Sequence, residues 1–350
     1  MKKAFLSLSI LLFTLGCSEE DQFSLFVSND YNQKLYKPNS TEDLGEILVV
    51  TEKINWENEI GQSLKTNFEN LVSTTPLPHE KEFKLDFIDP KGLIKNIKKH
   101  NCILELKIDK RIQNTTSLPE PILDQWANGQ IIIKIKFNNQ KSAVNFIESN
   151  AIQLKQVIND FYYSKIIKNY SFNGPINEML KKKYAFQLAL PDSMKINRSI
   201  SNLTWLSQLT TEKDEVGEHE KQQGLIIYEY DYKDTSQFGL NKQIFLRDSL
   251  FKKHIVNKSK GTFMTTRKEE NSGNFSHHSF INLNGEYTVE WAGLWRVDND
   301  KMGGPFVSVS RLNPSKTKII TIEGYVYAPN FNKSDLIREL KAVIYSLKWL

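Results

Sequence analysis

The sequence predicts a mixed α+β and α/β protein with two parts. The N-terminal part is expected to be a layered α/β half with alternating strands and helices, and the C-terminal part a mostly antiparallel sheet with two flanking helices. A chain of 350 residues suits two domains of ordinary size. Hydrophobic residues make up 39% of the chain, including 20 Phe, 13 Tyr and 6 Trp, which a disordered chain would lack. The third observation is that the hydrophobic pattern changes near residue 173, from alternating strand and helix periods to mainly strand periods.

The N-terminal half alternates short apolar runs with segments of helical period. Residues 46–50 are apolar and mostly β-branched, and Trp56, Ile60 and Leu64 follow at helical spacing with Asn55 as the expected cap. Strands alternating with helices indicate a layered α/β arrangement. In order, we expect strand 46–50, helix 56–71, strand 83–88, a helix opened by Asp89 and Pro90, strand 102–108, a Pro-bounded helix around 122–126, strand 130–137 and a long helix over 144–161.

A break in the helical pattern at Asn173-Gly174-Pro175 is the best domain boundary in the chain. Beyond it the pattern is mainly that of strands, which favours an antiparallel α+β domain. The expected strands cover 186–191, 225–230, 287–291, 306–312 and 319–327, and the expected helices cover 240–256 and 332–347. The resulting division is a signal peptide at 1–16, a flexible tether at 17–43, an N-terminal domain at 44–172 and a C-terminal domain at 173–350.

The N-terminus carries the pattern of a secretory signal. Two lysines precede an apolar stretch too short to anchor in a bilayer, and the stretch ends at Cys17 before an acidic segment. Leu15-Gly16-Cys17 resembles the lipobox of bacterial lipoproteins, in which the cysteine becomes acylated and N-terminal; Thr14 departs from that pattern, which usually has Leu. We therefore predict lipidation at Cys17, palmitate included.

Lipidation predicts attachment to a membrane, because each buried CH₂ contributes about 0.8 kcal/mol and two or three acyl chains suffice for stable anchoring. We expect a cell-envelope protein, in the outer membrane given Ser18 after the cysteine, while the periplasmic or surface side stays open. Cleavage removes Lys2 and Lys3, so the formal charge falls from +5 to +3. With few arginines and scattered lysines, this balance does not indicate a nucleic-acid partner.

The common signatures of catalysis and cofactor binding are mostly absent from the sequence, which argues against an enzyme without deciding the question and predicts no cofactor. Cys102, the one cysteine of the mature body, lies in an apolar strand and is expected to be a buried, inert thiol. His277 and His278 are adjacent. In a strand their side chains would point to opposite faces, so we expect no shared metal ion there.

The strand-turn-strand segment 295–308 is the best candidate for a binding surface. Alternation places Trp291 and Trp295 on one face, where large rings are expected to be core. The turn combines carboxylates with glycines that permit positive φ, a composition that suits a polar ligand but that any hairpin turn also requires. The candidate surface residues are Trp295, Arg296, Asp298, Asp300, Gly303 and Gly304.

Several motifs resemble one family. Leu44-Gly45-Glu46, Gly293-Leu294-Trp295, Met302-Gly303-Gly304-Pro305-Phe306 and Glu323-Gly324-Tyr325-Val326-Tyr327-Ala328-Pro329 are similar to a Bacteroidetes lipoprotein family built on a domain of unknown function, number 4837. The resemblance spans nearly the whole mature chain. It implies a lipoprotein of a Bacteroidetes envelope and brings no catalytic residues.

Two functions follow from these patterns. The first is a lipid-anchored, non-enzymatic envelope protein that binds a small ligand or an envelope protein partner, with the segment 295–308 as its surface. The alternative is an envelope hydrolase that uses acidic or histidine side chains; it predicts that at least two of them meet in one concave pocket beside a group of perturbed pKa. The residues considered for that role are Glu290, Asp298, Asp300, His277 and His278.

Overall fold

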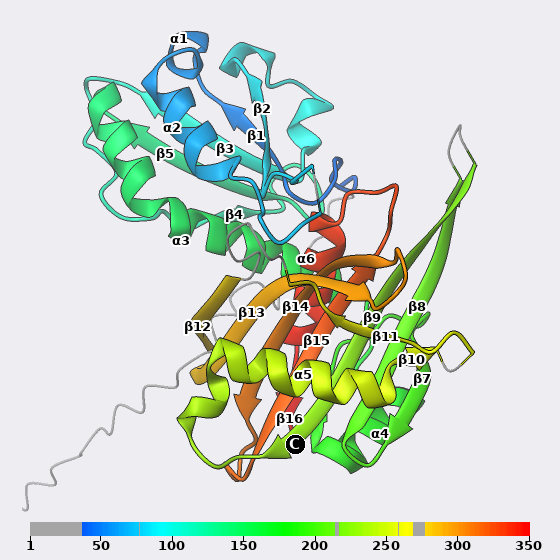
Figure 1. Cartoon of the computed structure of the whole chain (residues 1–350). Coiled ribbons are helices and arrows are strands. Elements are labelled where there is room, and N and C mark those ends of the chain that lie inside the picture. Colours follow the sequence, from blue (N-terminus) through cyan, green and yellow to red (C-terminus); the bar gives the residue numbers. More distant parts are fainter. Residues whose placement is uncertain (1–36, 77, 214–216, 258, 269–276) are drawn as a thin grey trace, which may run out of the picture.

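The computed structural model describes residues 37–350 except 77, 214–216, 258 and 269–276. Within these residues the chain has an α+β fold, with a mixed sheet and helices in the N-terminal part and a curled antiparallel sheet in the C-terminal part (Figure 1). The predicted fold class is confirmed. The predicted signal peptide, most of the predicted tether and Cys17 lie outside the described residues.

The N-terminal sheet has the strand order β2-β1-β3-β5-β4. Its strands are β1 (Glu46–Val50), β2 (Lys84–Ile88), β3 (Cys102–Ile108), β4 (Ile122–Leu123) and β5 (Ile131–Phe137). All neighbours are parallel except β4 and β5. Alternate residues such as Ile47, Leu104 and Ile133 face one core, which α2 (Glu59–Phe68) and α3 (Gln140–Ile167) complete.

The expected helix over 56–71 is divided into α1 (Lys53–Trp56) and α2. The backbone is extended at Asn58, which is the residue that precedes α2, so the predicted cap Asn55 lies inside α1. At Gly61 a Cβ atom would lie 1.8 Å from the Trp56 carbonyl oxygen. Only glycine therefore permits this close approach between the two helices.

Two other expected helices are wrong. The segment after Asp89 forms only the 3₁₀ turns η2 (Pro90–Gly92) and η3 (Ile97–Lys99). Ile122 and Leu123 pair with Ile132 and Ile131 as strand β4. The chain reverses at a turn that includes Asp124, whose φ is 51°, so that β4 can pair antiparallel with β5. This pairing outweighs the local helical pattern.

The C-terminal sheet is antiparallel in the order β10-β11-β13-β14-β15-β9-β8-β7, and β12 also pairs with β13. The strands are β7 (Lys195–Ile200), β8 (Leu203–Lys213), β9 (Glu218–Asp231), β10 (Val256–Asn257), β11 (Thr262–Thr266), β12 (His277–Leu283), β13 (Glu286–Val297), β14 (Gly303–Leu312) and β15 (Lys318–Tyr327). A separate pair joins β6 (Phe186–Gln187) to β16 (Lys348–Trp349).

Helices cover both faces of this sheet. The expected helices appear as α5 (Leu240–His254) and α6 (Ser334–Tyr345); α4 (Pro175–Tyr184) and the turn η4 (Thr235–Phe238) were not expected. One core contains Leu340 of α6 with Val309 and Ile322, and another contains Phe251 of α5 with Trp291 and Phe306. In Figure 1, α6 lies between the C-terminal sheet and α3, so it contacts both parts of the molecule.

Candidate functional site

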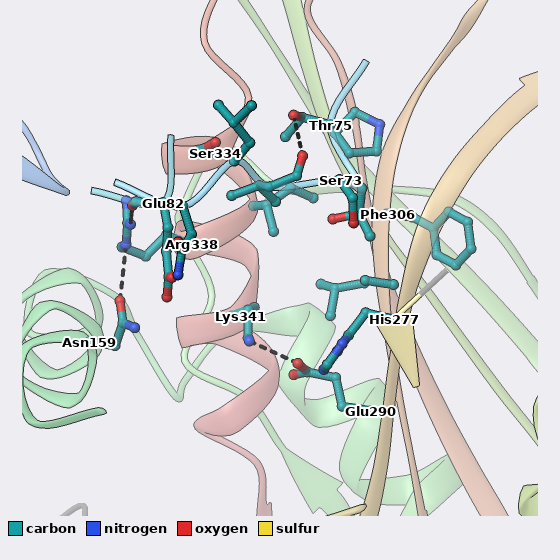
Figure 2. Close-up of a pocket in the computed structure, with 18 of the residues that line it drawn as sticks. Ser73, Thr75, Glu82, Asn159, His277, Glu290, Phe306, Ser334, Arg338 and Lys341 are labelled. Atoms are coloured by element: carbon teal, nitrogen blue, oxygen red, sulfur yellow. Dashed lines mark hydrogen bonds and ion pairs between the residues drawn. The ribbon is translucent and has the colours of Figure 1, made fainter. Parts of the chain in front are cut away.

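A cavity of about 350 Å³ lies where the N-terminal part, α6 and the C-terminal sheet meet (Figure 2). Elements far apart in sequence form its wall: a loop before β2, helices α3 and α6, and strands β12 to β14. The wall consists of residues 70–75 and Glu82, Asn159 and Tyr163 of α3, Ser334, Ile337, Arg338 and Lys341 of α6, His277 of β12, Glu290 and Ala292 of β13, and residues 305–307 of β14.

The N-terminus of α6 is held by a side chain from the N-terminal part. The Glu80 carboxylate accepts hydrogen bonds from the backbone N–H groups of Lys333, at 2.7 and 2.9 Å, and of Ser334, at 2.7 Å. The first N–H groups of a helix have no partner within the helix, and a negative charge at that end is favourable. Glu80 therefore fixes the position of α6 against the loop that forms one wall of the cavity.

Arg338 makes a second connection between α6 and the N-terminal part. Its Nε donates to Asn159 Oδ1 at 3.2 Å, and its Nη2 donates to the Glu82 carbonyl oxygen at 2.8 Å. Arg338 also pairs with Asp335 one turn earlier. Burial raises the pKa of Asp335 to about 6, and the neighbouring guanidinium only partly opposes this.

The floor of the cavity contains a mostly buried ion pair. Lys341 Nζ of α6 lies 2.9 Å from Glu290 Oε1 of β13, and the Tyr345 hydroxyl donates to the other carboxylate oxygen of Glu290. Burial alone would lower the pKa of Lys341, but the Glu290 carboxylate reverses this and holds the pKa well above its ordinary value. Burial raises the pKa of the Tyr345 hydroxyl, and the negative charge of Glu290 raises it further. Lys341 is therefore a stable cation at neutral pH.

Charges in the wall of the cavity are balanced within the protein. Glu82 pairs with Lys155 at 2.7 Å, and Glu290 pairs with Lys341. Hydrogen-bonding groups also line it, such as the side chains of Ser73 and Thr74. Together with the apolar side chains of Ile337 and Val307, such a lining suits a ligand of low net charge with polar groups.

Of the residues considered for hydrolysis, Glu290 and His277 line this one cavity, while Asp298 and Asp300 do not. The His278 ring lies 3.0 Å from the Phe238 carbonyl oxygen and does not line the cavity. Both oxygens of Glu290 already accept hydrogen bonds, from Lys341 and Tyr345. The carboxylate thus has a structural role in this arrangement, since a general base must reach the proton that it removes.

The predicted surface residues lie at the end of the β13–β14 hairpin. Trp295 is only 3% exposed, and its indole N–H donates to the Val326 carbonyl oxygen at 3.1 Å. Trp291 is fully buried, so the prediction that both rings belong to the core is confirmed. Gly304 is also buried, and a Cβ atom there would lie 2.0 Å from the Val326 carbonyl oxygen.

The turn itself borders a second cavity of about 330 Å³. Trp295, Arg296, Asp300, Gly303 and Gly304 line it, and Asp298 does not. Asp300 accepts hydrogen bonds from the backbone N–H groups of the next two residues and lies 3.8 Å from Lys260. These contacts are typical of a hairpin turn, and Asn299 supplies its positive φ of 59°.

Cys102 is fully buried, and burial raises the pKa of its thiol to about 12, as expected of an inert thiol.

One group of side chains in the N-terminal part has the spacing of metal ligands: Glu46, Asp86 and His100. Lys84 Nζ already lies 2.7 Å from Glu46 and 3.5 Å from Asp86. Since His100 Nδ1 accepts from the Cys102 N–H at 3.2 Å, neutral His100 carries its proton on Nε2, and that nitrogen has no lone pair for an ion.

The cavity between the two parts could not be predicted from the sequence. Its wall combines segments more than 250 residues apart, such as the loop containing Glu80 and the start of α6. The one signal in the sequence was the alternation of β13, which places Glu290 on the face of the strand opposite to Trp291 and Trp295.

Two family models match adjacent parts of the chain. Residues 40–171 match DUF8532, and residues 174–346 match DUF4837, both domains of unknown function. The motifs noted at Leu44 to Glu46 therefore fall in the first of these, and the DUF4837 resemblance is confined to the second half. No curated protein matches the chain.

One similar solved structure comes from Bacteroides thetaiotaomicron VPI-5482, determined at 1.50 Å resolution. It is 8% identical with a TM-score of 0.23, and the match covers 47% of this chain and 45% of that one, so it supports no argument about fold or function. The family assignment rests on the sequence models alone: the C-terminal part of this chain belongs to the DUF4837 family of domains of unknown function.

Proposed function

We propose that this protein is a lipid-anchored, non-enzymatic protein of a Bacteroidetes cell envelope that binds a ligand or a partner protein in the cavity between its two parts. The lipidated Cys17 would hold it at a membrane, in the outer membrane given the residue that follows. No nucleic-acid partner is proposed. Support for the anchor comes from the sequence pattern at Leu15-Gly16-Cys17.

The observation that carries the binding function is the composition of the cavity. Both parts of the molecule contribute walls, and its charged side chains are already paired. A site with paired charges and accessible hydroxyl side chains at Ser73 and Thr74 favours an occupant with little net charge, either a small polar molecule or an uncharged loop of a partner. The hairpin from Trp295 to Ser308 borders this cavity through residues 305–307.

The test is capture of the tagged lipoprotein from gently solubilised native membranes, with native mass spectrometry of what remains bound. We expect a bound species that is lost in Ile337→Glu, which places a charge in the cavity wall. Ile152→Glu is the matched control, because Ile152 is 84% exposed on α3 and does not line the cavity. Recovery of the protein alone, without partner or adduct, would count against the proposal.

An envelope hydrolase is the second candidate, favoured by one observation: Glu290 and His277 line the same cavity as Lys341, whose pKa is perturbed. It predicts turnover of ester, amide or glycoside substrates that is lost in Glu290→Gln and His277→Ala while the fold is retained. Turnover that survives both substitutions, or no turnover at all, would leave binding as the function.

A further inference from the structure

Strand β12 is an open edge of the C-terminal sheet. It pairs with β13 in unbroken register from His277 opposite Ala292 to Leu283 opposite Glu286. Among the residues that the structure describes, no strand pairs with its other side, and none of its seven residues is buried. In Figure 1, β12 lies at the outer margin of the sheet. Its outer backbone N–H and C=O groups are therefore available to another strand.

The other edges of the two sheets carry features that oppose such pairing. β7 contains Lys195 and Arg198 and has an irregular register between Ile196 and Arg198. β2 contains Lys84 and Asp86, while β4 and β10 have two residues each. β12 reads His-His-Ser-Phe-Ile-Asn-Leu, with no Asp, Glu, Lys, Arg or Pro and no bulge. Charges, bulges and short length are the usual protection of an edge, and β12 lacks all three.

Aromatic side chains lie beside this edge. Phe280 of β12 is 58% exposed and Tyr287 of β13 is 56% exposed, and their ring centroids are 5.2 Å apart. The Phe238 ring lies 5.8 Å from Tyr287 on the same face. A partner strand would thus gain both backbone hydrogen bonds and apolar contact at Phe280.

We infer that the β12 edge pairs with β12 of a second copy of this chain, joining two sheets about a two-fold axis. Two identical strands related by a two-fold axis pair antiparallel, and Phe280, the central residue of His277–Leu283, then lies opposite Phe280 of the second copy. The strand is complementary to itself, because an uncharged edge places no like charges opposite each other. A charged partner strand would find no opposite charge on β12.

The test is cysteine crosslinking of the full lipoprotein in detergent. Directly opposite residues of antiparallel strands have Cα atoms about 4.5–5.5 Å apart, which lies within the range that a disulfide spans. Phe280→Cys is therefore expected to form a disulfide-linked dimer on mild oxidation. Phe245→Cys, on α5 and not on β12, is 63% exposed; it is the matched control and should remain a monomer. Equal crosslinking of the two variants would overturn the inference.

A second variant separates pairing from crosslinking. Phe280→Lys places two like charges opposite each other and removes the ring contact, so the dimer dissociation constant measured by sedimentation should rise about tenfold or more. Amide hydrogen exchange of β12 should slow as protein concentration rises. A monomer at every concentration, or protection of β12 that does not depend on concentration, would contradict the inference, the latter because another segment of the same chain would then cover the edge.

Discussion

Lys341 of α6 and Glu290 of β13 form an ion pair of 2.9 Å at the floor of the cavity between the two parts of the molecule. The side chains are 24% and 9% exposed, and Tyr345 completes the hydrogen bonding of the carboxylate. The same helix is held by Glu80 and Arg338 to the N-terminal part. α6 therefore fixes the walls of the cavity relative to each other, and its contacts are the first to test.

Replacing Lys341 with Met should destabilise the protein by about 2–4 kcal/mol, because it leaves the mostly buried Glu290 carboxylate without its cation. Urea unfolding followed by circular dichroism measures the change. Lys268→Met is the control, since that side chain is 73% exposed and its pair with Asp248 should contribute at most about 1 kcal/mol. Equal effects of the two substitutions would show that the Lys341 pair has no special role.

Glu323→Gln should be more severe, with a loss of about 3–5 kcal/mol. Arg247 of α5 donates to both Glu323 oxygens at 2.7 Å, and both side chains are fully buried. Asp109→Asn, which breaks the bidentate contact with the 87% exposed Arg111, is the control and should change the stability little, because exposed ion pairs are screened by water. A thermal midpoint that stays the same in Glu323→Gln would refute the assigned role of the buried pair.

Gly304→Ala should displace β14 from β15, because the added Cβ would meet the Val326 carbonyl oxygen at 2.0 Å. We expect a loss of about 1–3 kcal/mol and a changed tryptophan fluorescence, since the nearby Trp295 donates to that same oxygen. Gly239→Ala, where the nearest atom is 3.2 Å away, should retain most of its stability. An unchanged emission spectrum in Gly304→Ala would contradict the close approach of these strands.

The pH dependence of stability should include a contribution from Asp160 of α3. Burial raises its pKa to about 6, and the hydrogen bond from Gln156 only partly opposes this. Above pH 6 the folded protein holds a partly buried carboxylate that the unfolded chain would expose to water. This penalty is relieved as the pH falls from 6 to 4, because the folded state takes up the proton first.

Asp160→Asn should therefore stabilise the protein by about 1–2 kcal/mol at pH 7.5 and have little effect at pH 4. Thermal unfolding at the two pH values measures this, and Asp192→Asn, at an exposed turn, is the control. A stabilisation of equal size at both pH values would contradict the assignment.

The sequence predicted features that depend on one strand or one helix. The alternation of β13 placed Trp291 and Trp295 in the core, because side chains of a strand alternate between faces, and the apolar period located α3, α5 and α6. Polar strands such as β7 and β12 were missed, since edge strands have no buried face to produce a hydrophobic pattern.

Tertiary contacts account for what the sequence could not predict. Ile122 and Leu123 are a strand only because β5 lies beside them. The contact between Glu80 and Ser334 joins residues 254 positions apart and has no local signature. For the same reason the cavity and its Glu290–Lys341 floor become visible only in three dimensions.

The proposed lipid anchor at Cys17 would hold the protein at a membrane, and labelling tests this proposal most directly. Cells expressing the wild-type chain or Cys17→Ala are grown with a radiolabelled or clickable palmitate analogue and separated into membrane and soluble fractions. We expect a labelled, membrane-bound wild-type protein and an unlabelled Cys17→Ala protein released from the membrane. Lipid label retained by Cys17→Ala, or a wild-type protein without label, would contradict it.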